Sequence, residues 1–451
     1  MVIVFLLAGL AALAALVGLH WYVWRRLVRD TTAGPGLARR AGTVVFVALP
    51  VMMVAALAAE RGGAPFWLQR TLAWPGFLWL ALFVYLGLAL IAGEVVRPLL
   101  RRFLDRRGPA RAPVPPLRLR KAETVPAGAP ESPEAAEGAK GAERASSTSD
   151  APDAPETQGA SGSTTSGAPD SPRLLAAPSR RLFVSRVVAG SAAAVAAGTV
   201  GYGTYGVLRG PRVKRVTVPL AKLPRGAHGF RISVVSDIHL GPVLGRGFAQ
   251  KVVDTINSTQ PDLIAVVGDL VDGSVKDLGP AAAPLAQLRA RHGAFFVTGN
   301  HEYFSGAQQW VDEVRRLGLR PLENARVELP AFDLAGVNDI AGESEGQGPD
   351  FTKALGDRDT SRASVLLAHQ PVQIHDAVEH GVDLQLSGHT HGGQLWPGNF
   401  VADLANPTLA GLERYGDTQL YVSRGAGAWG PPTRVGAPSD ITVVELASRQ
   451  A

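Results

Sequence analysis

The first 104 residues are dominated by three long apolar runs that are separated by short polar segments. The first run covers residues 2–24, the second covers 41–59 and the third covers 72–93. A helix needs about 20 predominantly apolar residues to cross a bilayer. Three such runs in so short a stretch fit membrane helices better than buried helices of a soluble domain. We therefore predict three transmembrane helices in residues 1–104.

Apolar patterning disappears in the next part of the chain. No aromatic residue occurs between Phe103 and Phe183, and Pro, Ala, Gly, Ser and Glu dominate the sequence. Such a segment cannot bury enough apolar surface to offset the entropy of ordering the chain. We predict a disordered linker over residues 105–178.

A fourth apolar run covers residues 182–208 and is rich in Ala and Gly. The sequence before it reads Ser179-Arg180-Arg181-Leu182-Phe183. An arginine pair followed by Phe and a weakly apolar core resembles a twin-arginine export signal. An ordinary membrane helix with basic flanks is the alternative. Residues 179–210 are thus predicted to form a fourth transmembrane helix or a twin-arginine signal anchor.

From Lys214 onward, short apolar runs alternate with helical patterns. The runs that predict buried strands are Ile232–Ser236, Leu263–Val267, Ala294–Val297 and Val365–Ala368. Helical periodicity follows the first three, at Gly247–Ile256, Ala281–Leu288 and Gln308–Leu317. Strands that alternate with helices indicate a layered α/β domain. We place this domain at residues 214–451.

Composition and charge narrow the classes of function. The chain of 451 residues has no cysteine, which excludes disulfides and thiolate metal ligands. Its net charge is +6, but many arginines border the apolar runs. That placement indicates orientation in a membrane, and no specific binding of nucleic acid is expected. Nine of the ten histidines lie between His228 and His391 inclusive, which is a first indication of a metal site.

Polar clusters follow each of the four predicted strands, and a fifth cluster follows a short apolar stretch near residue 386. Their residues are Asp237-Ile238-His239, Gly268-Asp269, Gly299-Asn300-His301-Glu302, His369 and Gly388-His389-Thr390-His391. Residues two apart on an extended backbone point the same way, so Asp237 and His239 are expected to bind one ion together. A mixture of carboxylate, imidazole and amide ligands suits Mn, Fe or Zn better than Ca or Mg.

These five clusters, in this order, resemble the pattern of the calcineurin-like metallophosphoesterase family. Within the family the chain is similar to bacterial membrane-associated phosphodiesterases with a twin-arginine leader. The resemblance covers residues from about 230 to 446. It implies an α/β fold, a layered two-sheet metallophosphoesterase sandwich, here preceded by an α-helical transmembrane region.

The same resemblance implies a centre of two divalent metal ions. It assigns Asp237, His239 and His391 to one ion, Asn300, His369 and His389 to the other, and Asp269 to a bridge between them. A metal-activated hydroxide would attack the phosphorus of a phosphodiester or phosphomonoester. His301 would protonate the leaving oxygen or stabilise charge, and a structural histidine is the alternative for it.

Other polar residues of the domain are interpreted more simply. Asp272 is interpreted as the cap of a turn, although it could also orient a ligand. Arg424 and Arg434 are interpreted as surface or structural arginines, and His375 and His380 as structural histidines on a helix.

Three functions of different classes are compatible with this organisation. The first is a membrane-anchored metal-dependent phosphoesterase, which the complete ligand set favours. The second is a catalytically inactive metal-binding or regulatory domain on a membrane protein. The third is a transporter or channel, which the low number of intramembrane charges argues against. The phosphate-ester substrate stays open, and lipid-linked, nucleotide and cell-wall phosphates are all candidates.

The distribution of arginines predicts a topology. Five lie between the first two runs and five follow the third, whereas only Arg61 and Arg70 lie between the second and third. The positive-inside rule then places the N-terminus outside and the linker in the cytoplasm. A fourth crossing makes the protein multi-pass in the cell membrane, with an extracytoplasmic catalytic domain. One group of basic residues disagrees with this topology, because it follows the fourth run, at the end that is predicted to lie outside. These residues are Arg209, Arg212, Lys214 and Arg215.

Overall fold

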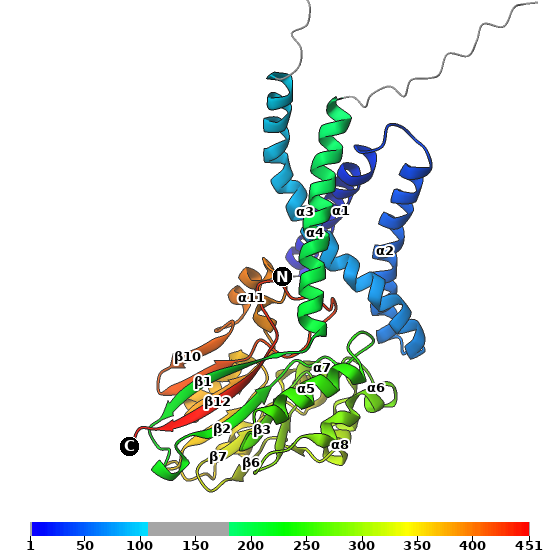
Figure 1. Ribbon diagram of the computed structural model, residues 1–451. Coiled ribbons are helices and arrows are strands. Elements are labelled where there is room, and N and C mark those ends of the chain that lie inside the picture. Colours follow the sequence, from blue (N-terminus) through cyan, green and yellow to red (C-terminus); the bar gives the residue numbers. More distant parts are fainter. Residues whose placement is uncertain (1, 107–179, 451) are drawn as a thin grey trace, which may run out of the picture. The chain divides into compact units, whose positions relative to one another are not determined.

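The C-terminal half of the chain is built from two six-stranded sheets (Figure 1). The computed structural model describes residues 2–106 and 180–450. The first sheet has the strand order β1-β12-β2-β3-β4-β5. In it β2, β3, β4 and β5 are parallel neighbours, and β12 pairs with β2 in the antiparallel sense. Its strands are β1 (Arg212–Leu220), β2 (Phe230–Val235), β3 (Leu263–Val267), β4 (Ala294–Val297), β5 (Arg320–Pro321) and β12 (Asp440–Ser448).

The second sheet has the order β10-β11-β9-β8-β7-β6. Its four central strands are parallel, and β6 and β10 are antiparallel to their neighbours. Its strands are β6 (Ala325–Glu328), β7 (Asp333–Gly336), β8 (Ser364–Leu367), β9 (Leu384–Ser387), β10 (Gly411–Tyr415) and β11 (Thr418–Val422).

The alternation of side chains along β3 shows why the sequence folds in layers. Leu263, Ala265 and Val267 belong to the apolar core between the two sheets. Ile264 and Val266 point the other way and pack against helices. Every residue of β3 is buried, because both faces of the strand are covered. A strand buried on both faces has a continuous apolar sequence instead of an alternating one.

Helices cover the outer face of each sheet. The first sheet is covered by α5 (Arg246–Ser258), α6 (Val275–Ala282) and α8 (Ala307–Arg316). The second is covered by α9 (Phe351–Leu355) and α10 (Ile374–Glu379). The remaining helical segments of this half are α7 (Asn300–Ser305), α11 (Gly398–Ala405) and the short turns Arg225–Ala227, Ala283–Gln287, Ile340–Glu345, Pro371–Gln373 and His391–Gly393.

This architecture confirms the predicted α/β fold of two layered sheets. One predicted element was wrong. The helix expected at Ala281–Leu288 begins earlier, at Val275, and continues from Ala283 as a tighter 3-10 turn. The Ser274 hydroxyl accepts a hydrogen bond from the Asp277 N–H and so caps the earlier start. Pro284 lacks an N–H and cannot extend the α-helical ladder.

The N-terminal half supplies long apolar helices. Three in the described residues are long and apolar enough to cross a membrane: α2 (Leu37–Arg61), the stretch of α3 (Phe66–Arg106) up to Leu104, and α4 (Arg180–Leu208). The segment α1 (Val2–Trp24) is helical over the predicted range, and its crossing stays a prediction. Side chains of all four helices share one apolar cluster. The predicted linker lies almost entirely outside the described residues.

Candidate metal centre

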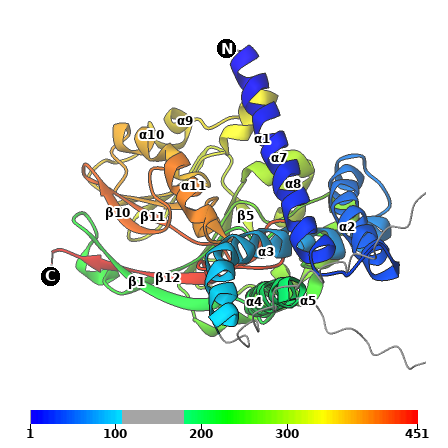
Figure 2. The same cartoon turned by 90° about the horizontal axis from the view of Figure 1, so that it is seen from above.

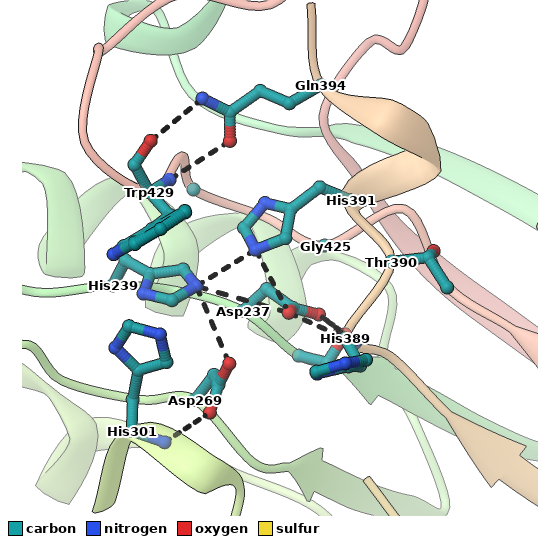
Figure 3. Close-up of polar contacts among 12 residues, drawn as sticks. Asp237, His239, Asp269, His301, His389, Thr390, His391, Gln394, Gly425 and Trp429 are labelled. Carbon is teal, nitrogen blue, oxygen red and sulfur yellow. Dashed lines mark hydrogen bonds and ion pairs between the residues drawn. The ribbon is translucent and has the colours of Figure 1, made fainter. Parts of the chain in front are cut away.

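The candidate ligands lie where strands of both sheets end. Asp237 follows β2, Asp269 follows β3 and Asn300 follows β4, all in the first sheet. His369 follows β8 and His389 follows β9, in the second sheet. Because these strands are parallel neighbours within each sheet, their carboxyl ends share an edge, and loops at such edges form ligand sites in α/β folds. Packing of the two sheets brings the two edges together (Figure 3).

One group of potential ligands consists of Asp237, His239 and His391. The Nε2 atoms of His239 and His391 lie 3.0 Å apart. Asp237 Oδ1 lies 3.3 Å from His391 Nε2 and 4.0 Å from His239 Nε2. Their potential ligand atoms thus converge on one point, with Asp237 and His239 almost completely buried.

A second group consists of Asp269, His369 and His389. His369 Nε2 lies 3.1 Å from Asp269 Oδ2. The side-chain amide oxygen of Asn300 lies 3.0 Å from His389 Nδ1, so Asn300 belongs to the same group. Asp269 also approaches the first group, since its Oδ2 lies 3.8 Å from His239 Nε2. The Asp269 carboxylate is therefore located between the two groups.

The backbone of these loops is not extended, which corrects the geometry assumed from the sequence. A φ angle between 49° and 72° is found at Asp237, His239, Asp269, His389 and His391. This left-handed region is uncommon for residues other than glycine. The side chains of Asp237 and His239 do converge, but because of a coiled loop rather than the two-residue repeat of a strand. Backbone conformations of this kind concentrate at functional sites.

Two glycines allow the loops to approach one another. A Cβ atom at Gly388 would collide with the carboxylate of Asp237 and the side chain of Ser236. A Cβ atom at Gly299 would collide with the side chain and the N–H of Asp269. Both glycines are therefore required by close packing around the two central aspartates.

Asp272 links the first group to His301. Its Oδ1 atom lies 2.8 Å from Nδ1 of His239 and 2.8 Å from Nδ1 of His301. When Asp272 accepts the Nδ1 hydrogen of His239, Nε2 of that ring stays available for a metal. The interpretation of Asp272 as a turn cap was too simple, because the sequence does not show which histidines its loop will face.

These contacts shift the pKa values of both partners. Burial opposes ionisation of Asp272, but the charge of His239 and hydrogen bonds from both histidines outweigh it and lower the pKa to about 2. Burial would likewise lower the pKa of His301, but the hydrogen bond to Asp272 and its charge raise that pKa to about 9. The contact with Asp272 therefore favours the protonated form of His301.

His301 also borders solvent between two exposed aromatic side chains. Its ring centre lies 5.6 Å from that of Phe304 and 5.7 Å from that of Trp429. The exposed fractions of these residues are 76% and 54%. His301 thus lies next to two exposed rings, whereas Asp237, His239 and His369 are almost completely buried.

Two buried residues support the centre in ways that the sequence did not reveal. The Glu302 carboxylate accepts hydrogen bonds from the N–H groups of Gly299, Asp269 and Leu270 and so ties two loops together. The guanidinium of Arg434 donates to the carbonyl of His391 at 2.9 Å and lies 3.1 Å from its Nδ1. Burial lowers the pKa of Arg434 to about 10. Arg434 is thus structural, and it holds a candidate ligand in place.

The remaining histidines of the sequence analysis lie elsewhere. His375 is on α10 and packs near Tyr415, and His380 ends the same helix and packs on Phe351. The described contacts join neither of them to the two groups.

The donor set fits divalent metal ions. Nε2 of His369 is buried and faces Asp269 Oδ2 at 3.1 Å, while its Nδ1 lies 2.8 Å from the carbonyl of Val267. Burial lowers the pKa of His389 to about 4 and holds the pKa of His391 well below its usual value, whereas at His369 the charge of Asp269 outweighs burial and raises the pKa well above its usual value. His389 and His391 are therefore neutral, as metal ligation requires.

Comparison with known proteins agrees with this site. Residues 230–393 match the family model described as calcineurin-like phosphoesterase. An uncharacterized metallophosphoesterase of Aquifex aeolicus is 37% identical over 240 residues, which cover 52% of this chain and 91% of that protein. The uncharacterized metallophosphoesterase YkuE of Bacillus subtilis is 30% identical over 285 residues, covering 60% and 98%.

A third relative is named as a transmembrane protein with a metallophosphoesterase domain, from Danio rerio. It is 39% identical over 259 residues, which cover 54% of this chain and 59% of that protein. The chain thus matches less than two thirds of the length of this relative. The A. aeolicus and B. subtilis proteins are matched over nearly their whole length, and the chain belongs to the calcineurin-like metallophosphoesterase family.

Proposed function

We propose that the protein is a membrane-associated, metal-dependent phosphoesterase with a centre of two divalent ions. The observation that carries this proposal is the convergence of two ligand groups on Asp269, whose Oδ2 atom approaches a histidine of each group. Proteins of this family bind divalent metals, and mixed carboxylate, imidazole and amide donors suit Mn, Fe or Zn.

The proposed ligands follow the two groups. Asp237, His239 and His391 hold one ion, while Asn300, His369 and His389 hold the other. Asp269 contributes to both. When bound, two such ions would lower the pKa of a shared water and offset the charge of a phosphate.

The residues around the ions have separate tasks. Asp272 orients His239 and keeps its Nδ1 protonated, and it holds the proton on His301. The Nδ1 hydrogen of His301 faces Asp272, so His301 gives the proton on its other ring nitrogen, Nε2, to the leaving oxygen of the ester, which avoids release of an unstable alkoxide. Phe304 and Trp429 flank the proton donor and contact the group that leaves.

Both phosphodiesters and phosphomonoesters are candidate substrates, and esters of a lipid alcohol are included among them. Three apolar helices in the described residues support association with the cell membrane. We further propose a multi-pass topology with an extracytoplasmic catalytic domain. The arginine pair at Arg180 and Arg181 opens α4 and is compatible with a twin-arginine signal.

Hydrolysis by the full-length protein in detergent tests the function. The substrates are bis(4-nitrophenyl) phosphate and 4-nitrophenyl phosphate, assayed as purified, after chelation, and after addition of Mn, Fe or Zn. We expect chelation to abolish hydrolysis and one of these metals to restore it. Metal binding without hydrolysis of either ester or of other phosphate esters would instead identify an inactive relative. Hydrolysis that resists chelation would refute metal dependence.

A further inference from the structure

A short helix beside the metal centre exposes an unusual amount of apolar surface. None of the residues of α11 is buried. Phe400, Val401 and Leu404 are 61%, 70% and 90% exposed, and Trp396, just before the helix, is 48% exposed. Residues 400, 401 and 404 lie on one side of a helix with 3.6 residues per turn. We call Trp396, Phe400, Val401 and Leu404 the α11 surface.

The α11 surface is also poor in charge. Asp403 is the single charged residue between positions 393 and 411. Exposed, contiguous apolar surface of this kind marks a contact with another apolar phase. Contact of this apolar face with lipid is more favourable than its contact with water.

Contacts of the residues just before α11 show which helices lie next to it. Trp396 donates its N–H to the carbonyl of Val435 at 2.9 Å, and its own carbonyl accepts from the Tyr85 hydroxyl of α3 at 2.9 Å. Leu395 and Val435 pack on the apolar cluster formed by α1, α2, α3 and α4. In Figure 2, α11 lies beside α3. The segment that leads into α11 therefore packs on α3, a helix long enough to cross a membrane.

The end of α4 gives the depth of this contact. Thr204 Oγ1 lies 2.7 Å from Thr433 Oγ1, close to the segment that pairs with Leu395 and Trp396. Tyr202 and Tyr205 are 75% and 62% exposed at the same end of α4. Exposed tyrosines at the end of a span, followed by Arg209, are typical of the interface between bilayer and water.

We propose that α11 lies in the membrane interface, with Phe400, Val401 and Leu404 buried in the lipid of the leaflet next to the catalytic domain. A short amphipathic helix binds in this way by burying its apolar face at the boundary of headgroups and acyl chains. The occupant of the α11 surface is thus the bilayer that also holds α2, α3 and α4.

The position of α11 also indicates the class of substrate, and this step of the inference rests on the proposed function. Four residues join the turn that carries His391 to α11, and a Cβ atom at Gly393 would collide with the backbone of Asn399. The metal centre is thereby held at the lipid surface. Its substrates then belong to the class of phosphate esters whose alcohol portion is anchored in that leaflet.

The absence of native cysteine permits a direct test. Leu404→Cys in the full chain is labelled with an environment-sensitive fluorophore, and the protein is reconstituted in phosphatidylcholine vesicles. Quenchers are lipids brominated at a shallow or a deep acyl position, and aqueous iodide. Val378→Cys on α10, whose native side chain is 38% exposed, is the matched control. Both substitutions lie at exposed positions and leave the core unchanged.

The label at 404 is expected to be quenched by brominated lipid, most strongly by the shallow position, and to be protected from iodide. The label at 378 should show the opposite behaviour. Iodide quenching at 404 as strong as at 378 would overturn the proposal. Protection from both quenchers would also overturn it, because a second protein copy or another partner would then cover α11. The fluorescence readout does not depend on catalysis. The position of α11 can therefore be refuted while hydrolysis is observed, and it can be supported while hydrolysis is absent.

Discussion

At the scale of single residues, the centre depends on hydrogen bonds that fix the orientation of its histidines. Asp272 contacts Nδ1 of both His239 and His301. His369 Nδ1 lies against the carbonyl of Val267. The contacts at Nδ1 leave the Nε2 atoms of His239 and His369 facing the interior of the site. At His301 the contact with Asp272 favours the protonated ring. Metal ligation and proton donation are thus assigned to different histidines.

His301→Ala tests that separation. The variant is expected to retain its metal ions, because His301 belongs to neither proposed ligand set, but to lose about 10²–10⁴-fold in kcat. The loss should be smaller for esters with a good leaving group such as 4-nitrophenolate, since protonation matters less there. Metal content and kcat are measured together. Loss of both ions, or an undiminished rate with a poor leaving group, would contradict the role of His301.

Asp272→Asn tests the origin of the pKa of His301. That pKa is raised to about 9 by Asp272, so activity of the native protein should fall as pH rises through this value and the acid is lost. Removal of the carboxylate lowers the pKa of His301, and the alkaline fall should move to lower pH. The pH dependence of kcat is the measurement, with Asp254→Asn on the exposed side of α5 as the control. An unchanged alkaline limb would refute the coupling.

At the scale of elements, the apolar patterns were most informative for two central strands of the first sheet, but they missed β11, although every residue of that strand is buried. Leu263–Val267 and Ala294–Val297 were predicted with the bounds that the structure has for β3 and β4. The edge strands β6 and β10 contain no buried residue and have no clear apolar pattern, so they were not predicted. The helix α6 was placed wrongly because its start depends on the cap at Ser274 and its end on Pro284.

The loops that carry the site show which of its features the sequence could not predict. The five clusters could be read from the sequence, and the structure brings their side chains together. The left-handed backbone at Asp237, His239, Asp269, His389 and His391 could not be predicted, because it is stabilised by contacts between distant loops. The roles of Glu302 and Arg434 depend on the same contacts. Their partners are up to 43 residues away, and the sequence contains no local signal for them.

Gly388→Ala tests the close packing of these loops. The added methyl group would collide with Asp237 and Ser236, and overpacking of a tight interior typically costs about 1–3 kcal/mol. We expect a lower midpoint of thermal unfolding and weaker metal binding. Gly247→Ala is the matched control, because a Cβ atom at that position of α5 meets no other atom within 4 Å. Equal behaviour of the two variants would show that the loops do not need the glycine.

At the scale of the whole molecule, α4 joins the metallophosphoesterase domain to the other apolar helices. The helix ends at Leu208 and β1 begins at Arg212, so few residues separate a candidate span from the first sheet. Backbone and side-chain contacts between residues 203–204 and 433–434 shorten the tether further. A crossing by α4, as proposed, would hold the domain close to the membrane surface.

Protease accessibility tests the proposed side of the membrane. The arginine distribution predicts that the catalytic domain lies outside, so protease added to intact cells with a permeable outer layer should remove it. A tag on a known cytoplasmic protein serves as the control for leakage. Cleavage of the domain only after lysis would place it in the cytoplasm and contradict the fourth crossing.

The central claim is that Asp269 is shared by two metal ions, and metal stoichiometry tests it most directly. The native protein, Asp269→Asn and Asp262→Asn are reloaded with Mn, Fe or Zn, and bound metal is counted by mass spectrometry of the purified proteins. Asp262 is a matched control, since it is buried but bonds the backbone of Arg231 away from the two groups. We predict two ions per chain in the native protein and in Asp262→Asn, and loss of both ions in Asp269→Asn. Two ions retained by Asp269→Asn, or none bound by the native protein, would contradict the account.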